Sequence, residues 1–246
     1  MKIGILICGY LDAEFSTANR SYSTLICSAL HSVNRDIRFF EYDAYNQHLP
    51  QLDECDGYII IGSLANAYDN APWIIDLMQW TLRCEARRKP QVGIGFGHQL
   101  IARALGGTVE RSPKGWGLGN HEVNVVTQKR WMNLSIDRLR MLIIHQDQVV
   151  TVPKGMRVIA SSDFCANFML AKDNHLLTVQ GHPELTPQVM KEQIERRKSQ
   201  LSEAHYRSIV QQSSQVLDSA TVLYWMDAFF TFNTESIQDT NVQNAV

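Results

Sequence analysis

The stretch from Gly93 to Gly107, which reads G-I-G-F-G-H-Q-L-I-A-R-A-L-G-G, has the pattern of a site that holds a nucleophile. Apolar residues before Gly95 predict the end of a buried strand, and the apolar spacing after Gln99 predicts a helix. Glycines two positions before and after Gly95 allow the sharp turn called a nucleophile elbow, which lifts its central side chain above the sheet edge. That central residue is Gly95, which has no side chain with which to attack a substrate.

Two other blocks follow apolar, strand-like runs in the same way. Gly62-Ser63 comes after residues 58–61, and Gly181-His182-Pro183-Glu184 comes after residues 176–179. Together the three blocks resemble those of class I glutamine amidotransferases, whose elbow reads G-x-C-x-G-H-Q, with Cys where this chain has Gly95. Within that family the chain resembles stand-alone members that are similar to the glutaminase domain of GMP synthase.

The resemblance implies a role for each matching residue. In the family a thiolate attacks the side-chain amide of glutamine, a His moves the proton, a carboxylate orients the His, and backbone amides bind the oxyanion. Gly95 is then the nucleophile position, His182 the base and Glu184 its orienting carboxylate, two residues apart on one side of an extended segment. The remaining matches are the oxyanion hole at Gly62 and Phe96 and substrate contacts at Ser63, Gln99, His145 and Asp147. Gln146 replaces the Gly that is usual in the family segment H-G-D-x-V.

Gly95 leaves two functional hypotheses open. An elbow residue at positive φ costs a non-glycine residue about 1–3 kcal/mol, whereas glycine adopts such angles almost freely. One hypothesis is that a chain with Cys at position 95 hydrolyses a γ-glutamyl amide, in glutamine or another γ-glutamyl compound, so that the present chain is inactive. The alternative is a natural pseudoenzyme that binds a glutamine-like ligand or a protein partner without turnover. A natural loss and a deliberate inactivation both fit, and attack by a water activated by His182 is disfavoured because an amide is a poor target for it.

Several other residues invite chemical roles that the sequence does not favour. His98 follows the elbow and is interpreted as structural. His121, His145 and His182 lack metal-type spacing, so no metal is predicted. Cys8 is the thiol best placed to replace the missing nucleophile, but a buried apolar role fits it better. The glycines around Gly95 lack the third glycine of a dinucleotide-binding loop, and no cofactor is expected.

Composition excludes further classes of function. The chain has 246 residues, of which 45% are hydrophobic and 20% charged, as expected of a globular α/β protein. A formal charge of −2 gives no basic face for nucleic acid or an acidic membrane, and no apolar run is long enough to span a bilayer. Five cysteines without a C-x-x-C pair favour reduced thiols and a cytoplasmic location. No P-loop occurs, so any ammonia transfer would need a separate synthase chain.

The order of elements predicts a flavodoxin-like, doubly wound, mostly parallel sheet with an antiparallel extension and C-terminal helices. Strands are expected at residues 2–8, 37–42 and 58–61, and helices at 22–33 and from Pro72, with a ligand-facing loop at 9–17. Short strand-like pieces from Thr108 to residue 179 predict the extension. Helices follow at residues 189–213 and 216–232. The predicted divisions are an amidotransferase-like domain at 1–190, a helical appendage at 191–233 and a flexible tail at 234–246.

Overall fold

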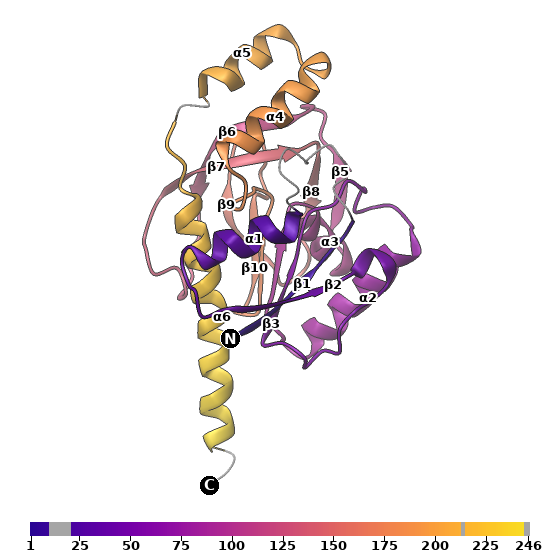
Figure 1. The fold of residues 1–246 in the computed structure, drawn as a ribbon, viewed down its shortest axis with the longest axis vertical. Coiled ribbons are helices and arrows are strands. Elements are labelled where there is room, and N and C mark those ends of the chain that lie inside the picture. Colours follow the sequence, from indigo (N-terminus) through magenta and orange to yellow (C-terminus); the bar gives the residue numbers. More distant parts are fainter. Residues whose placement is uncertain (10–20, 213–214, 244–246) are drawn as a thin grey trace.

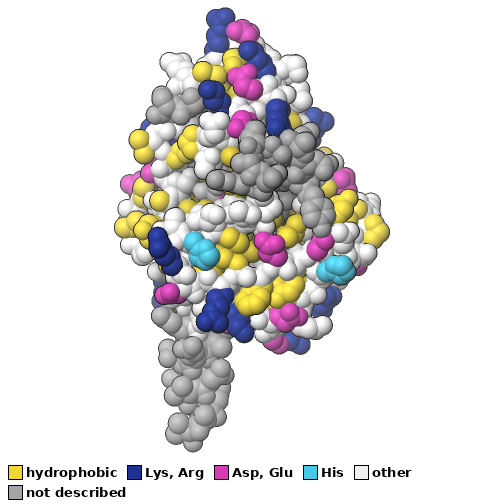
Figure 2. All heavy atoms as spheres, viewed as in Figure 1, with side chains coloured by type: hydrophobic (Ala, Val, Ile, Leu, Met, Phe, Trp, Pro, Cys, Tyr) yellow, Lys and Arg dark blue, Asp and Glu magenta, His cyan; other side chains and the backbone are white. Residues whose placement is uncertain are grey.

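The structure is a computed structural model of the chain, and it describes residues 1–9, 21–212 and 215–243. Within these residues the main sheet has nine strands in the order β2-β1-β3-β4-β11-β10-β9-β6-β7. Most of the ligand-facing loop predicted at residues 9–17 lies outside the described residues. In the described part of the chain, no helix is long and apolar enough to cross a membrane. On the face in Figure 2, the described acidic and basic side chains are interspersed.

The five strands at one end of the main sheet run parallel to one another. They are β2 (Arg38–Tyr42), β1 (Lys2–Leu6), β3 (Gly57–Ile60), β4 (Gln91–Ile94) and β11 (Leu176–Val179). Every residue of β3, β4 and β11 is buried, as is typical of central strands covered by helices on both faces. The predicted parallel, doubly wound half of the fold is therefore confirmed.

The antiparallel extension continues the same sheet from β11. It contains β10 (Met169–Lys172), β9 (Arg157–Ser161), β6 (Gly117–Val125) and β7 (Arg138–His145), each antiparallel to its neighbours. A separate two-stranded sheet pairs β5 (Thr108–Arg111) with β8 (Asp147–Thr151). The predicted extension is confirmed, although β8 has no counterpart among the predicted strands.

Helices cover both faces of the parallel half (Figure 1). One face packs against α1 (Tyr22–His31) and α6 (Ser219–Gln243), and the other against α2 (Pro72–Ala86) and α3 (Phe96–Ala104). Pro72 lies in the first turn of α2, where the missing N–H of proline costs nothing. The aromatic residues Trp225, Phe229 and Phe230 of α6 are buried in the core. A short 3-10 helix, Ala44–Asn46, follows β2.

The prediction of one long helix at residues 189–213 is wrong. The chain instead forms α4 (Pro187–Arg197), a 3-10 turn (Lys198–Gln200) and α5 (Glu203–Gln212). Leu201 is extended and packs against an apolar cluster between α4, α5 and the sheet, and Ser202 then starts α5 by accepting the N–H of His205 at 3.2 Å. A serine that caps a helix competes with continuation of the preceding one. α6 remains helical to Gln243, within the segment predicted as a flexible tail, and residues 244–246 are outside the description.

Candidate active site

The elbow lies at the carboxyl end of β4, in the middle of the parallel strands. Gly95 has φ 55° and ψ −107° and is the N-cap residue that immediately precedes α3. A Cβ on Gly93 would lie 2.5 Å from the carbonyl oxygen of Gly97, and one on Gly97 would lie 2.1 Å from that of Ile60. Backbone packing therefore excludes a larger residue at both flanking positions, and the positive φ of Gly95 is one that glycine adopts without strain. The strand, sharp turn and helix predicted from the glycine spacing are all present.

The ring of His182 lies directly over the α-carbon of Gly95. A Cβ on Gly95 would lie 2.7 Å from Cε1 and 3.0 Å from Nε2 of that ring. The His182 backbone N–H donates to the carbonyl oxygen of Leu142 at 2.9 Å, which fixes the loop after β11 against β7. The space next to the nucleophile position is thus filled in part by the imidazole, so a side chain at position 95 would require the ring to move.

Glu184 stands behind His182, away from the elbow. Its Oε1 is 2.7 Å from Nδ1 of His182, and the two side chains are 0% and 5% exposed respectively. A carboxylate bonded to Nδ1 holds that nitrogen in its protonated form and leaves Nε2, the atom nearer Gly95, as a proton acceptor. The geometry therefore suits a base oriented toward the elbow.

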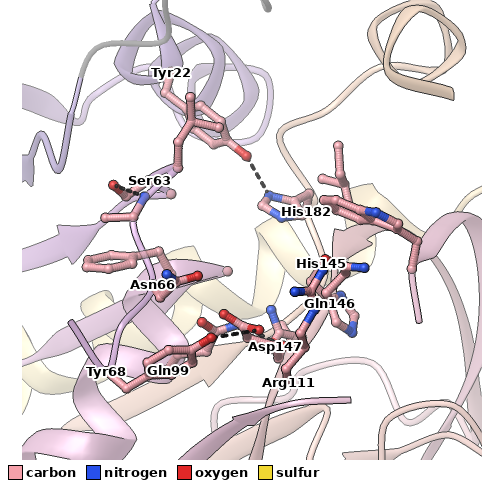
Figure 3. Close-up of a pocket in the computed structure, with 18 of the residues that line it drawn as sticks. Tyr22, Ser63, Asn66, Tyr68, Gln99, Arg111, His145, Gln146, Asp147 and His182 are labelled. Atoms are coloured by element: carbon pink, nitrogen blue, oxygen red, sulfur yellow. Dashed lines mark hydrogen bonds between the residues drawn. The ribbon is translucent and has the colours of Figure 1, made fainter. Parts of the chain in front are cut away.

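Tyr22, the first residue of α1, also contacts this pair. Its hydroxyl is 2.8 Å from Nδ1 of His182 (Figure 3), and burial and the nearby Glu184 raise the pKa of its phenol well above the usual value. The sequence analysis placed Tyr22 only at the start of a helix and missed this contact. No local pattern marks it, because the two residues are 160 positions apart.

A cavity of about 310 Å³ opens beside the elbow and collects the predicted residues. Its lining includes every predicted site residue except Glu184, namely Gly62, Ser63, Gly95, Phe96, Gln99, His145, Asp147 and His182. The lining also includes residues that the sequence analysis did not single out, among them Asn66, Tyr68, Arg111, Trp116, Gln180 and Arg197. The volume is at the lower end of the range for small-molecule sites.

Hydrogen-bonded side-chain amides form one wall of the cavity. Gln99 donates from Nε2 to the backbone oxygen of Asp147 at 2.9 Å and to Oε1 of Gln180 at 3.0 Å. Gln146, which replaces the usual glycine, accepts from Arg111 at 2.6 Å. Since both hydrogen bonds of Gln99 use its NH2 group, its oxygen is the group left to accept from a ligand. Because Gln146 replaces the usual glycine and accepts from Arg111, the positively charged guanidinium group of Arg111 lies at the rim of the cavity.

Burial sets the ionisation of two cavity residues. Desolvation lowers the pKa of His145 well below its usual value, so that this ring is neutral at neutral pH. Its two ring nitrogens have no hydrogen-bond partner among the described residues. Desolvation also raises the pKa of Asp147, although its hydrogen bond from Tyr68 opposes that shift. The cavity therefore offers a neutral imidazole beside a partly desolvated carboxyl group.

The first turn of α3 provides backbone donors toward the cavity. Gly95 precedes the helix and supplies no side-chain cap, and Phe96 is the first helical residue. The initial N–H groups of a helix have no acceptor within it and favour negative charge. On the opposite side, Ser63 accepts the N–H of Ala65 at 3.2 Å and so shapes the loop after β3 that contains Gly62. This arrangement can stabilise an oxyanion formed over Gly95.

The other residues considered for chemistry lie elsewhere. Cys8 is fully buried and absent from the cavity lining, and burial raises the pKa of its thiol. His98 bonds Thr178 inside the core, and burial lowers its pKa to about 3. Among the described residues, no three His, Cys, Asp or Glu side chains are grouped as metal ligands would be. All five cysteines are free, as predicted.

Comparisons with known proteins identify the family that this chain matches. The family model Glutamine amidotransferase class-I matches residues 17–200. Gamma-glutamyl peptidase 2 of Arabidopsis thaliana is 36% identical over 149 residues, which cover 59% of this chain and 60% of the plant protein. One of the subunits of the glutamine-hydrolysing GMP synthase of Sulfolobus acidocaldarius is 29% identical over 164 residues, covering 63% of this chain and 83% of the archaeal protein.

The fold is also found in solved structures. A glutamine amidotransferase from Thermotoga maritima superposes with a TM-score of 0.72 at 19% identity and covers 94% of this chain and 96% of its own. Because the identity is this low, the structural likeness is evidence for a shared fold only. The match of the family model over most of the sequence, together with the elbow and its histidine, shows that this chain belongs to the class I glutamine amidotransferase family.

Proposed function

We propose that the cavity binds a γ-glutamyl compound, such as glutamine or a γ-glutamyl peptide, and that the chain with Gly95 does not turn it over through a covalent intermediate. The observation that carries the proposal is the position of His182, with its ring over Gly95 and Glu184 behind it. In this proposal His182 is the base, Glu184 is its orienting carboxylate, and Gly95 is the position that lacks the thiol. Covalent catalysis needs that thiol, because no other nucleophile is held against the bound carbonyl.

In this proposal each part of a γ-glutamyl ligand has its own contacts. The γ-carbonyl lies over Gly95, and its oxygen accepts from the backbone N–H groups of Gly62 and Phe96. The α-amino and α-carboxyl groups reach the polar wall formed by Ser63, Gln99, His145 and Asp147. The lining of the cavity by all of these residues supports the assignment. The names of the relatives, a γ-glutamyl peptidase and a glutamine-hydrolysing GMP synthase, indicate the same class of ligand.

The activity of a chain with Cys at position 95 is the second part of the proposal. Such a chain would hydrolyse the γ-glutamyl amide in two steps. The Cys thiolate attacks the carbonyl and the amine leaves with a proton from His182, and a water then cleaves the resulting thioester to release the γ-carboxylate and the free thiol. Whether ammonia then passes to a separate synthase chain is a further hypothesis, supported only by the GMP synthase among the relatives. A cytoplasmic location stays a prediction from the cysteine content.

Calorimetric titration of the chain with Gly95 in place tests the binding proposal. Glutamine and γ-glutamylalanine are titrated against asparagine, which has one methylene fewer and cannot place its carbonyl over Gly95 when its α-groups are bound. We expect saturable binding of the γ-glutamyl compounds, weakened at least about tenfold for asparagine and for a Gln99→Leu variant. Absence of binding by every γ-glutamyl compound, in a sample that unfolds cooperatively, would refute the proposal.

A further inference from the structure

The side chain of Tyr22 connects three parts of the site that are remote in sequence. Its ring packs so closely on the loop after β3 that a Cβ on Gly62 would lie 3.0 Å from Cζ. Its hydroxyl reaches Nδ1 of His182 at 2.8 Å, the atom that also contacts Glu184 at 2.7 Å. The Tyr22 side chain therefore lies between the predicted oxyanion loop and the His182–Glu184 pair, and Figure 3 shows its hydroxyl directed at His182.

The hydrogen-bond possibilities of this group follow from its chemistry. Glu184 is completely buried, and a buried carboxyl group needs hydrogen-bond donors. Its Oε1 lies 2.7 Å from Nδ1 of His182, and the Tyr22 hydroxyl, which is the neutral form because its pKa is raised, lies 2.8 Å from the same nitrogen. When Nδ1–H donates to Glu184, the hydroxyl cannot donate to Nδ1, and the Nε2 lone pair is directed at the elbow. The hydroxyl oxygen beside Nδ1 is then a second acceptor for the same proton.

We infer that Tyr22 is the positioning residue of this site, which holds Glu184 and His182 in the arrangement that keeps Nε2 free to accept a proton above position 95. Tyr22 lines the cavity, and we assign its effect to His182, whose Nδ1 its hydroxyl reaches. The inference explains why the first residue of α1, which contacts the loop after β11, is a tyrosine. Its kinetic consequence rests on the proposed function, whereas its effect on the imidazole does not.

The variant Tyr22→Phe removes only the hydroxyl and keeps the ring on Gly62. Tyr58→Phe is the matched control, because Tyr58 is also buried and its hydroxyl donates to the oxygen of Gln51 at 2.8 Å, remote from the elbow. Nitrogen-15 NMR of the histidine rings is recorded first, on the chain as it is. We expect one His182 ring with a slowly exchanging Nδ1 proton, and we expect Tyr22→Phe to lose that protection and shift toward a tautomer mixture. Tyr58→Phe should leave the His182 signals unchanged.

The kinetic experiment uses the same two substitutions in a Gly95→Cys background. Tyr22→Phe should lower kcat for γ-glutamyl amide hydrolysis about tenfold and change KM less than twofold, because the ligand contacts are intact. Tyr58→Phe should leave both constants unchanged. Identical His182 spectra in the parent chain and in folded Tyr22→Phe would overturn the inference. If the spectra change as expected but Gly95→Cys has no activity in any form, the proposed function fails and the positioning role of Tyr22 stands.

Discussion

Two histidines in this chain follow a glycine, in Gly97-His98-Gln99 and in Gly181-His182-Pro183, and the fold gives them opposite environments. His98 points from α3 into the core, where Nδ1 is 2.8 Å from the hydroxyl of Thr178 on β11. His182 follows β11 and lies at the carboxyl edge of the sheet, between Glu184 and the cavity. Both rings are almost completely buried, at 0% and 4% exposed.

The difference shows that burial alone does not distinguish a core histidine from one that faces a cavity. His98 has a neutral partner, so desolvation dominates and its pKa falls to about 3. His182 has a carboxylate partner, with Oε1 of Glu184 2.7 Å from Nδ1, and lines the cavity. Access to a cavity and the charge of the partner therefore separate the two roles, and each can be altered experimentally.

The largest effect is expected at the elbow. Gly95→Cys should raise γ-glutamyl amide hydrolysis at least about 100-fold above the parent chain, because the base and oxyanion donors are already in place. It should also lower the free energy of unfolding by about 1–3 kcal/mol, since the positive φ strains a side chain and the His182 ring must shift. Initial rates of ammonia release and urea unfolding measure the two effects. Gly95→Ala is the control, with the same loss of stability and no gain of activity.

The carboxylate partner is the next feature to test. In the Gly95→Cys background, Glu184→Gln should reduce kcat by about 100- to 10,000-fold, because the amide favours the wrong tautomer of His182. Glu85→Gln is the comparison, since Glu85 also lies near a histidine, with Oε1 3.7 Å from Nε2 of His175. Steady-state kinetics of both variants measure the two losses of kcat. Equal losses of kcat in the two would remove the special role of Glu184.

The interior histidine should make stability depend on pH. His98 has a pKa of about 3 in the folded chain and 6.5 in the reference state, so the unfolded chain binds more protons between these values. The free energy of unfolding should therefore be highest above pH 6.5 and fall as the pH drops toward 3, by up to about 1.4 kcal/mol per pH unit. Burial shifts the pKa of His145 in the same direction, which steepens the slope.

Urea unfolding at pH 7.5, 6.0 and 5.0 measures that slope for two matched variants. His98→Gln should flatten it, because one group no longer takes up a proton on unfolding. His48→Gln, at an exposed position, should leave it unchanged. A slope that is the same in the parent chain and in His98→Gln would contradict the assignment.

The smallest effect is expected from the partner of His98. Thr178→Val keeps the shape of the side chain but leaves Nδ1 of His98 without its bond, and should lower the free energy of unfolding by about 1–2 kcal/mol. Affinity for glutamine should not change, because Thr178 is absent from the cavity lining. Urea unfolding and calorimetry on one preparation test both statements. Weaker binding with unchanged stability would contradict the assignment of Thr178 to the core and would indicate that it belongs to the site.

Much of the fold could be predicted because its signals are local. Glycines at positions 93 and 97 specify a turn that admits no larger residue there, Gly95 relieves the strain of a positive φ, and alternating apolar runs specify buried strands and helices. The break between α4 and α5 was missed because the amphipathic spacing continues past it, and the cap at Ser202 that ends it is a single residue. Strand β8 was missed because its sequence, D-Q-V-V-T, was interpreted as part of a pocket-forming motif.

The sequence by itself determined the elbow, the order of the three blocks and the absence of a side chain at position 95, since each is written in adjacent residues. Only the tertiary structure decided that Tyr22 contacts His182, that Gln99 bonds Gln180, and that Arg111 reaches Gln146. These pairs are 160, 81 and 35 positions apart, and no local periodicity couples them. Gln99 and Gln180 meet because they follow the parallel strands β4 and β11, which end at one edge of the sheet, whereas Arg111 reaches Gln146 through the antiparallel pairing of β5 with β8.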